Sequence, residues 1–127
     1  MDPTRTVSAI VVTWNHASFV PVCLEALVAQ TYPHMEIIIV DNASQDGTVE
    51  WVRAHFPQVR LLEQNRNIGF AAGFNHGALV ASGEWLLSVN PDLTPAIFLN
   101  AQFCISFLSG RFGPKESLGR FSCNPFR

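Results

Sequence analysis

Three apolar runs of this chain each end in a cluster of polar residues, and this recurrence constrains the fold more than any other feature. The runs cover residues 7–13, 37–40 and 85–89, and the clusters that follow are residues 14–15, 41–44 and 90–92. Runs rich in β-branched residues are typical of strands buried on both faces of a parallel sheet. The carboxyl ends of such strands meet at one edge, where ligands of open α/β sheets bind. We therefore expect one crevice to hold Thr13, Asp41, Asn90 and Asp92.

Between and beside these runs, helical patterns alternate with strand patterns as far as about residue 99. The helices are expected from Ser18, as N-cap, to just before Tyr32-Pro33; from a start marked by Ser44, Asp46 and Gly47; and over 70–81, with Gly83 as C-cap. The strands are expected at residues 7–13, 36–40, 59–62 and 85–89. This alternation predicts an α/β fold, a Rossmann-like parallel sheet with right-handed crossovers.

The helix predicted over 70–81 has two kinds of face. Phe70, Phe74 and Ala78 stack on one of them, whereas Gly73, Gly77 and Ala81 leave the other flat. We expect the flat face to pack closely against a neighbouring element.

Composition excludes several classes of protein. The 127 residues are 48% hydrophobic, enough for the core of one domain. The net charge is −2, and the eight Lys and Arg residues form no run, so the basic surface of a nucleic-acid-binding protein is absent. No stretch approaches the roughly 18 apolar residues of a membrane-spanning helix, and the first residues carry no signal-peptide pattern. Cys23, Cys104 and Cys123 lack paired-ligand spacing and are expected to be reduced structural thiols. We expect a soluble protein or a soluble piece of a larger one.

The chain changes character after residue 99. Six of the ten Phe residues lie in 98–127, and the net charge switches from −5 through residue 99 to +3 beyond it. We therefore expect two parts, residues 1–99 and a divergent tail, residues 100–127. The apolar tail is a candidate for self-association or contact with a membrane surface.

A nucleotide diphosphate fits the predicted sheet edge only if its negative charge is neutralised. Arg66 is the nearby base in the sequence, and no glycine-rich phosphate loop is present, which leaves a divalent metal as the natural partner. Asp92 offers a carboxylate oxygen to Mg²⁺ or Mn²⁺, and Asn90 offers an amide that could hold a metal-bound water. The alternative is that Asn90-Pro91-Asp92 is a plain turn.

The other polar residues of the edge are candidates for nucleotide binding. Asp41 is suited to accept hydrogen bonds from a ribose hydroxyl or a pyrimidine N–H, unless it only caps a turn or the next helix. Thr13, Trp14 and Asn15 follow the first strand, where a hydroxyl meets a phosphate or base and the indole stacks on a flat ring or lies at the core rim. Asn67 and Gly69 precede the third helix and either wrap the nucleotide or only form a turn. The four His residues share no ligand spacing and are expected to be solvated or locally hydrogen-bonded.

Three longer segments carry a resemblance to a known family. They are VSAIVVTWN, LEALVAQTYPHMEIIIVDNASQDGTVEWV and NIGFAAGFNHGALVASGEWLLSVNPDL. Together they resemble the family 2 nucleotide-sugar glycosyltransferases over about residues 7–95, most closely the rhamnosyltransferase-like branch. The resemblance implies a GT-A fold whose first half binds the nucleotide, with Thr13 and Asp41 on nucleotide contacts and Asn67 and Gly69 near the base and diphosphate. Residues 90–92 fall on the Asp-X-Asp metal motif, with Asn in its first position.

The same resemblance implies partners and a location. The donor is expected to be dTDP-rhamnose or a UDP-sugar, and the acceptor a saccharide or lipid-linked molecule of cell-envelope polysaccharide biosynthesis. The protein is expected in the cytoplasm, at the inner face of the membrane.

No part of residues 100–127 resembles the second half of this family, which supplies the general base. The catalytic residue is therefore unknown, and we expect a truncated donor half, or alternatively an inactive nucleotide-binding module. A phosphoacceptor receiver domain alternates in the same way, but it needs an acidic pair after the first strand, where this chain has Thr13-Trp14-Asn15.

Overall fold

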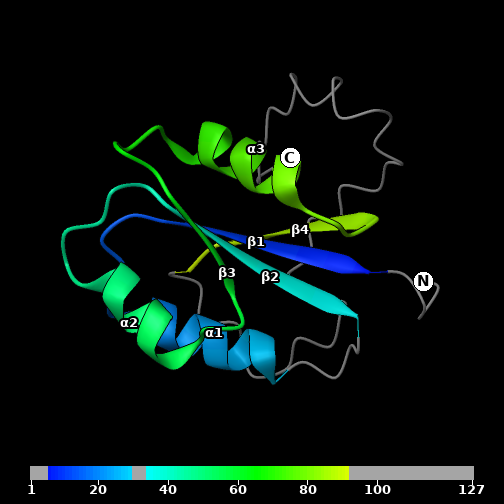
Figure 1. Cartoon of the computed structure of the whole chain (residues 1–127), viewed down its shortest axis with the longest axis horizontal. Coiled ribbons are helices and arrows are strands. Elements are labelled where there is room, and N and C mark those ends of the chain that lie inside the picture. Colours follow the sequence, from blue (N-terminus) through cyan, green and yellow to red (C-terminus); the bar gives the residue numbers. More distant parts are fainter. Residues whose placement is uncertain (1–5, 30–33, 92–127) are drawn as a thin grey trace.

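The fold is a parallel sheet with helices on both faces (Figure 1). The computed structural model describes residues 6–29 and 34–91. Its elements are β1 (Val7–Thr13), α1 (Val20–Val28), β2 (Met35–Asp41), α2 (Thr48–His55), β3 (Arg60–Glu63), α3 (Phe70–Val80) and β4 (Trp85–Val89). All neighbouring strands pair in parallel, in the order β3-β2-β1-β4. The predicted α/β, Rossmann-like sheet is confirmed, and each predicted strand is found with its ends shifted by at most one residue.

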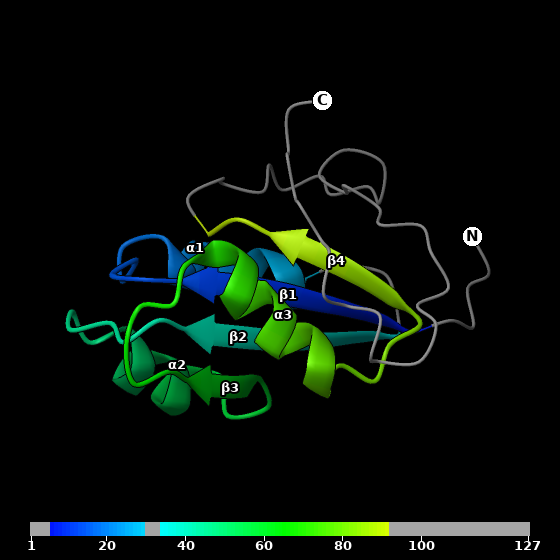
Figure 2. The same cartoon turned by 90° about the horizontal axis from the view of Figure 1, so that it is seen from above.

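The order of the strands creates a switch point between β1 and β4. From β1 the chain moves outward through β2 to β3, and α1 and α2 lie together on one face of the sheet (Figure 1). Helix α3 crosses the other face and returns the chain to β4, on the far side of β1 (Figure 2). Ligands of open α/β sheets bind outside the carboxyl ends of the strands at such a point. The switch point directs attention to the ends of β1 and β4.

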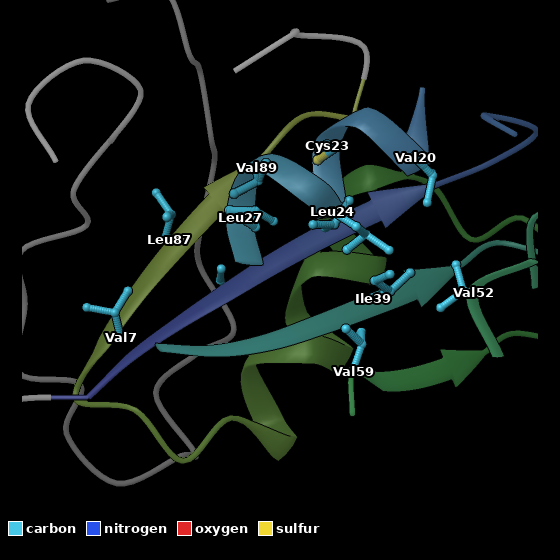
Figure 3. Close-up of a cluster of buried hydrophobic side chains, with 12 residues drawn as sticks. Val7, Val20, Cys23, Leu24, Leu27, Ile39, Val52, Val59, Leu87 and Val89 are labelled. Carbon is cyan, nitrogen blue, oxygen red and sulfur yellow. The ribbon is translucent and has the colours of Figure 1, made fainter. Parts of the chain in front are cut away.

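Each face of the sheet has its own apolar core, because β1 and β2 send alternate side chains to opposite faces. The cluster on the side of α1 and α2 is shown in Figure 3 and includes Val11, Leu24, Ile39 and Val52. The cluster under α3 consists of Ile10, Val12, Ile38, Val40, Phe74, Ala78 and Leu86. Burial on both faces explains why the strands read as continuous apolar runs rather than alternating ones.

Cys23 belongs to the first of these clusters. It is a buried free thiol, and burial raises its pKa to about 11. A thiol with so high a pKa carries little thiolate at neutral pH and is a poor nucleophile. The structural role predicted for this cysteine agrees with its place in the core, whereas Cys104 and Cys123 lie outside the described residues.

Helix α3 packs closely against the sheet because it contacts the strands through glycine. A Cβ atom on Gly73 would lie 2.9 Å from Cγ1 of Val12. The predicted flat glycine face is confirmed, but the predicted separation from the Phe74 side is wrong. Gly73, Phe74, Gly77 and Ala78 are all buried and form one face, because residues three and four apart lie on the same side of a helix. Phe70, a turn earlier, is 43% exposed and stacks on Phe74 with ring centroids 6.3 Å apart.

Two predicted helix caps are wrong. Helix α1 has Phe19 as N-cap without a side-chain hydrogen bond, because the preceding turn closes on the carbonyl of His16, which accepts from the N–H groups of Phe19 and Val20. Ser18 therefore lies inside that turn. Helix α3 ends at Val80, with Ala81 as C-cap in extended conformation, and Gly83 lies beyond it.

Gly83 has a packing role instead. Its N–H donates to Oγ of Ser8 at 2.8 Å, and a Cβ atom there would lie 2.5 Å from the same oxygen. The glycine lets the connection between α3 and β4 approach the start of β1. No helix of the described residues is long and apolar enough to cross a membrane.

Candidate functional site

Polar residues from separate segments meet at the carboxyl edge of the sheet, as predicted. Thr13 ends β1, Asp41 ends β2, and the two are partners in the β1–β2 ladder. On the other side of β1, Val89 of β4 pairs with Val11, so the exposed Asn90 follows near the same edge. Asp92, the predicted metal ligand, lies outside the described residues.

The carboxylate of Asp41 is held by Ser44. It is 1% exposed; Oδ2 accepts from the N–H of Ser44 at 2.9 Å, and Oδ1 accepts from the Ser44 hydroxyl at 2.6 Å. These contacts form the local turn that was the alternative interpretation of this residue. An ionised carboxylate has about four lone-pair sites, so the turn leaves acceptor capacity for a ligand.

Thr13 and Trp14 differ in their surroundings. The Thr13 hydroxyl is buried and lies 3.2 Å from Nδ1 of His16, which also accepts from the N–H of Trp14 at 3.2 Å. Because that backbone N–H is a donor, Nδ1 acts as an acceptor and the Thr13 hydroxyl donates to it. The Trp14 side chain is 50% exposed beyond the end of β1. The planar ring of a ligand can therefore reach the indole and stack on it.

The loops that follow β1 and β2 are tied together by hydrogen bonds. The N–H of Asn15 donates to Oγ of Ser44 at 2.9 Å, and the N–H of Gln45 donates to Oδ1 of Asn15 at 2.8 Å. Asn15 and Ala43 have positive φ values of 52° and 62°. Such values are uncommon for residues other than glycine and mark backbone that its surroundings hold in place.

A second connection between these loops runs through Asp46. Its Oδ2 accepts from the N–H of Ala17 at 2.8 Å, and its Oδ1 accepts from the N–H and the hydroxyl of Thr48, the first residue of α2. Burial acts to raise the pKa of Asp46, but the hydrogen bonds from Thr48 and Ala17 outweigh it and hold the pKa below its ordinary value. The sequence marked Asp46 as a helix start and gave no sign of its contact with the other loop.

The start of α3 is fixed by two asparagines. Oδ1 of Asn67 accepts from the N–H of Gly69 at 2.9 Å, which is the turn foreseen as an alternative. The Gly69 carbonyl in turn accepts from Nδ2 of Asn42 at 3.1 Å. Gly69 has φ 83°, a conformation that favours glycine. Asn42 is 2% exposed, and its Oδ1 has no hydrogen-bond partner. The sequence did not single out Asn42, which joins the end of β2 to the start of α3.

The described residues supply little of a metal centre by themselves. No three of their His, Cys, Asp and Glu side chains gather into a group that could hold a metal ion. Asn90 is the described member of the predicted ligand pair, and its exposed amide oxygen is of the type that Mg²⁺ and Mn²⁺ accept. The amide oxygen of Asn90 fits a hard divalent cation, whereas the carboxylate predicted beside it, that of Asp92, lies outside the described residues.

Comparison with known proteins identifies the family. The Glycosyl transferase family 2 model matches residues 8–97. The chain belongs to this family. It is 35% identical over 95 residues to the uncharacterized glycosyltransferase YibD of Escherichia coli, covering 72% of this chain and 27% of YibD. It is also 36% identical over 92 residues to the glycosyltransferase GlyG of Streptococcus pneumoniae, covering 70% and 31% of the two chains. The family 2 chain thus spans under a third of these relatives.

Solved glycosyltransferases share its fold. A mannosyltransferase from Pyrobaculum calidifontis, solved with GDP-Man and Mn²⁺, aligns with a TM-score of 0.65 and 33% identity over 72% of this chain and 29% of that one. TarS 1–349 from S. aureus, solved with UDP, aligns with a TM-score of 0.63 and 27% identity over 68% and 27% of the two chains. The GT-A-like fold is therefore shown, while the rhamnosyltransferase-like branch is not resolved by these relatives.

Proposed function

We propose that this family 2 chain forms the donor-binding half of a glycosyltransferase, which binds a nucleotide-diphosphate sugar for transfer to a saccharide or lipid-linked acceptor. The observation that carries the proposal is the pairing of Thr13 with Asp41 at the carboxyl edge, beside the switch point between β1 and β4. That is the position at which open α/β sheets bind nucleotides.

Each polar group of the edge has a role in this proposal. Asp41 uses its remaining lone pairs to accept from the nucleoside, either from a ribose hydroxyl or from a base N–H. The exposed Trp14 ring stacks on the base, with Thr13 and Asn15 shaping the floor beneath it. The Asn67–Gly69 turn lets the backbone approach the diphosphate without a Cβ atom in the way.

A divalent metal is the third element of the proposal. Asp92 and Asn90 would hold Mg²⁺ or Mn²⁺, which would neutralise the diphosphate and assist its departure as a leaving group. The Mn²⁺ in the mannosyltransferase structure supports this role. So does the scarcity of cationic side chains, since Arg66 is the base nearest the edge in the sequence.

The donor is narrowed to two classes. The resemblance to the rhamnosyltransferase-like branch favours dTDP-rhamnose or a UDP-sugar, and the TarS structures with UDP and UDP-GlcNAc support a uridine nucleotide. The mannosyltransferase structure holds GDP-Man, so GDP is the nucleotide to compare with UDP and dTDP in a binding experiment. We place the reaction in the cytoplasm, at the inner face of the membrane, where lipid-linked acceptors of the cell envelope are available.

A second candidate is a nucleotide-binding module without transfer activity. It is favoured by the roles that the acidic residues of the described edge already have. The remaining lone pairs of Asp41 serve the nucleoside in this proposal, and Asp46 bonds Ala17 and Thr48, so neither is assigned as the general base that an acceptor hydroxyl needs.

Calorimetry tests the donor-binding proposal. UDP, dTDP and GDP are titrated into the full chain with Mn²⁺ and again with chelator, and Asp92→Ala is compared with the wild type. We expect a pyrimidine nucleotide to bind more tightly with metal, and Asp92→Ala to abolish that difference. Equal binding in metal and chelator would refute the metal role, and no binding of any nucleotide would refute the function. A separate assay of sugar transfer by the chain decides between the two candidates, because only the glycosyltransferase would show turnover.

A further inference from the structure

Ser44 lies at the centre of a hydrogen-bond relay that joins both loops of the edge to Asp41. The Asn15 N–H donates to Oγ of Ser44, and the Ser44 hydroxyl donates to Oδ1 of Asp41 at 2.6 Å. The Ser44 N–H donates to the other carboxylate oxygen. The Ser44 side chain thus joins the loop after β1 to one oxygen of Asp41, and the Ser44 backbone holds the other oxygen.

The relay sets the direction of the Asp41 lone pairs. Asp41 is the last residue of β2, so its backbone is held by the ladder, but the orientation of its carboxylate is set by the two donors of Ser44. Pairing one lone pair on each oxygen fixes where the remaining acceptor sites point. A carboxylate that is already oriented loses less rotational freedom when it binds a ligand.

Two further contacts keep Ser44 in place. Oδ1 of Asn15 accepts from the N–H of Gln45, the residue after Ser44. Oδ2 of Asp46 accepts from the N–H of Ala17. Asn15 and Ala43, which both have positive φ values, are respectively the hydrogen-bond donor to Ser44 and the residue before Ser44. The loop clamp, which we define as Asn15, Ala17, Ser44, Gln45 and Asp46, therefore works as one unit.

We propose that Ser44 is a positioning residue for nucleotide binding and that the loop clamp preorganises Asp41 before the ligand arrives. This role rests on the proposed function, because it concerns the same nucleotide site. Asn15, expected from the sequence to touch the nucleotide, acts through the clamp in this proposal.

The test measures the Kd of the full chain for UDP and dTDP by calorimetry and its free energy of unfolding by urea titration. Ser44→Ala removes the hydroxyl, and Ser44→Thr retains it. Ser82→Ala is the matched control, because Ser82 also donates its N–H and hydroxyl to a carboxylate, that of Glu36, but Glu36 lies at the amino end of β2, opposite the carboxyl edge. A purely structural role would lower the free energy of unfolding and leave the Kd of the folded protein unchanged.

We expect Ser44→Ala to weaken nucleotide binding about tenfold, which corresponds to about 1.4 kcal/mol, while Ser44→Thr and Ser82→Ala bind like the wild type. Asp46→Asn, which lacks the second carboxylate oxygen, should weaken binding in the same direction and serves as the readout if Ser44→Ala does not fold. If folded Ser44→Ala binds nucleotide with wild-type affinity, the positioning role is wrong and the proposed function still stands. If Ser44→Ala does not fold, wild-type affinity in Asp46→Asn has the same meaning. Failure of the wild type to bind any nucleotide would overturn the proposed function and this role together.

Discussion

Gly77 of α3 and Ile10 of β1 approach so closely that a Cβ atom on the glycine would lie 2.7 Å from Cγ2 of the isoleucine. The same atom would lie 3.2 Å from Cγ2 of Val40. Both neighbours are fully buried branched side chains, which have little room to move. The contact fixes the distance between α3 and the sheet, and with it the position of the Gly69 turn at the carboxyl edge.

Gly77→Ala should therefore destabilise the protein, by about 1–3 kcal/mol for an overpacked core, even though alanine favours a helix by about 1 kcal/mol. Urea denaturation followed by circular dichroism measures the change. Leu79→Ala on the same helix is the control, because Leu79 is 46% exposed and its loss should cost about 0.5 kcal/mol or less. A Gly77→Ala protein as stable as the wild type would show that the helix can shift without cost.

Glu36 should make stability fall in acid. Its Oε2 accepts from the Ser8 hydroxyl at 2.7 Å and from the N–H and hydroxyl of Ser82, both at 2.9 Å. Burial acts to raise the pKa of Glu36, but these hydrogen bonds and the charge of Arg60 outweigh it and lower the pKa below the ordinary 4.5. A lowered folded-state pKa contributes stability that is present above the unfolded pKa and is lost as pH falls through the folded one.

Glu36→Gln should consequently be less stable than the wild type at pH 7, with a difference that shrinks as the pH falls below about 4.5. Urea titrations of both proteins between pH 7 and pH 3 measure it. A gap between them that stays constant over this range would show that ionisation of Glu36 contributes nothing to folding.

Asp41→Asn should weaken nucleotide binding by about 1.5–3 kcal/mol, the range for a hydrogen bond to a charged group. The fold should survive, because the remaining amide oxygen can still accept from Ser44. Calorimetry with UDP, beside a thermal unfolding curve without ligand, separates the two roles of this residue. A variant that is unfolded without ligand would assign Asp41 to the turn rather than to the nucleotide.

The strands were predictable because their signal is local. Residues 7–13 and 37–40 are largely apolar on both faces, as central parallel strands must be, and their common direction places Thr13 and Asp41 at one edge. The loop clamp was not predictable, because Asn15 and Ser44 lie 29 residues apart and no spacing within either loop encodes their contact. The wrong caps have the same cause. Ser18 and Gly83 are good capping residues, but the His16 carbonyl and the Ser8 hydroxyl decide the local structure.

The 127-residue polypeptide by itself should transfer no sugar. The family match ends at residue 97, and the matched relatives are more than three times as long as the part they share with this chain. A bound donor still needs an acceptor hydroxyl held in line and a base to take its proton, and positioning and general base catalysis each contribute orders of magnitude in rate. Within the described part of the edge, Asp41 accepts hydrogen bonds from Ser44 of its own loop, and Asp46 accepts one from Ala17 of the loop after β1. Incubation with labelled dTDP-rhamnose and UDP-hexoses, over saccharide and lipid-linked acceptors, is the direct measurement. Metal-dependent turnover that disappears in Asp92→Ala would contradict this expectation and direct the search for the base to Glu116, the acidic residue beyond position 99, or to a partner chain.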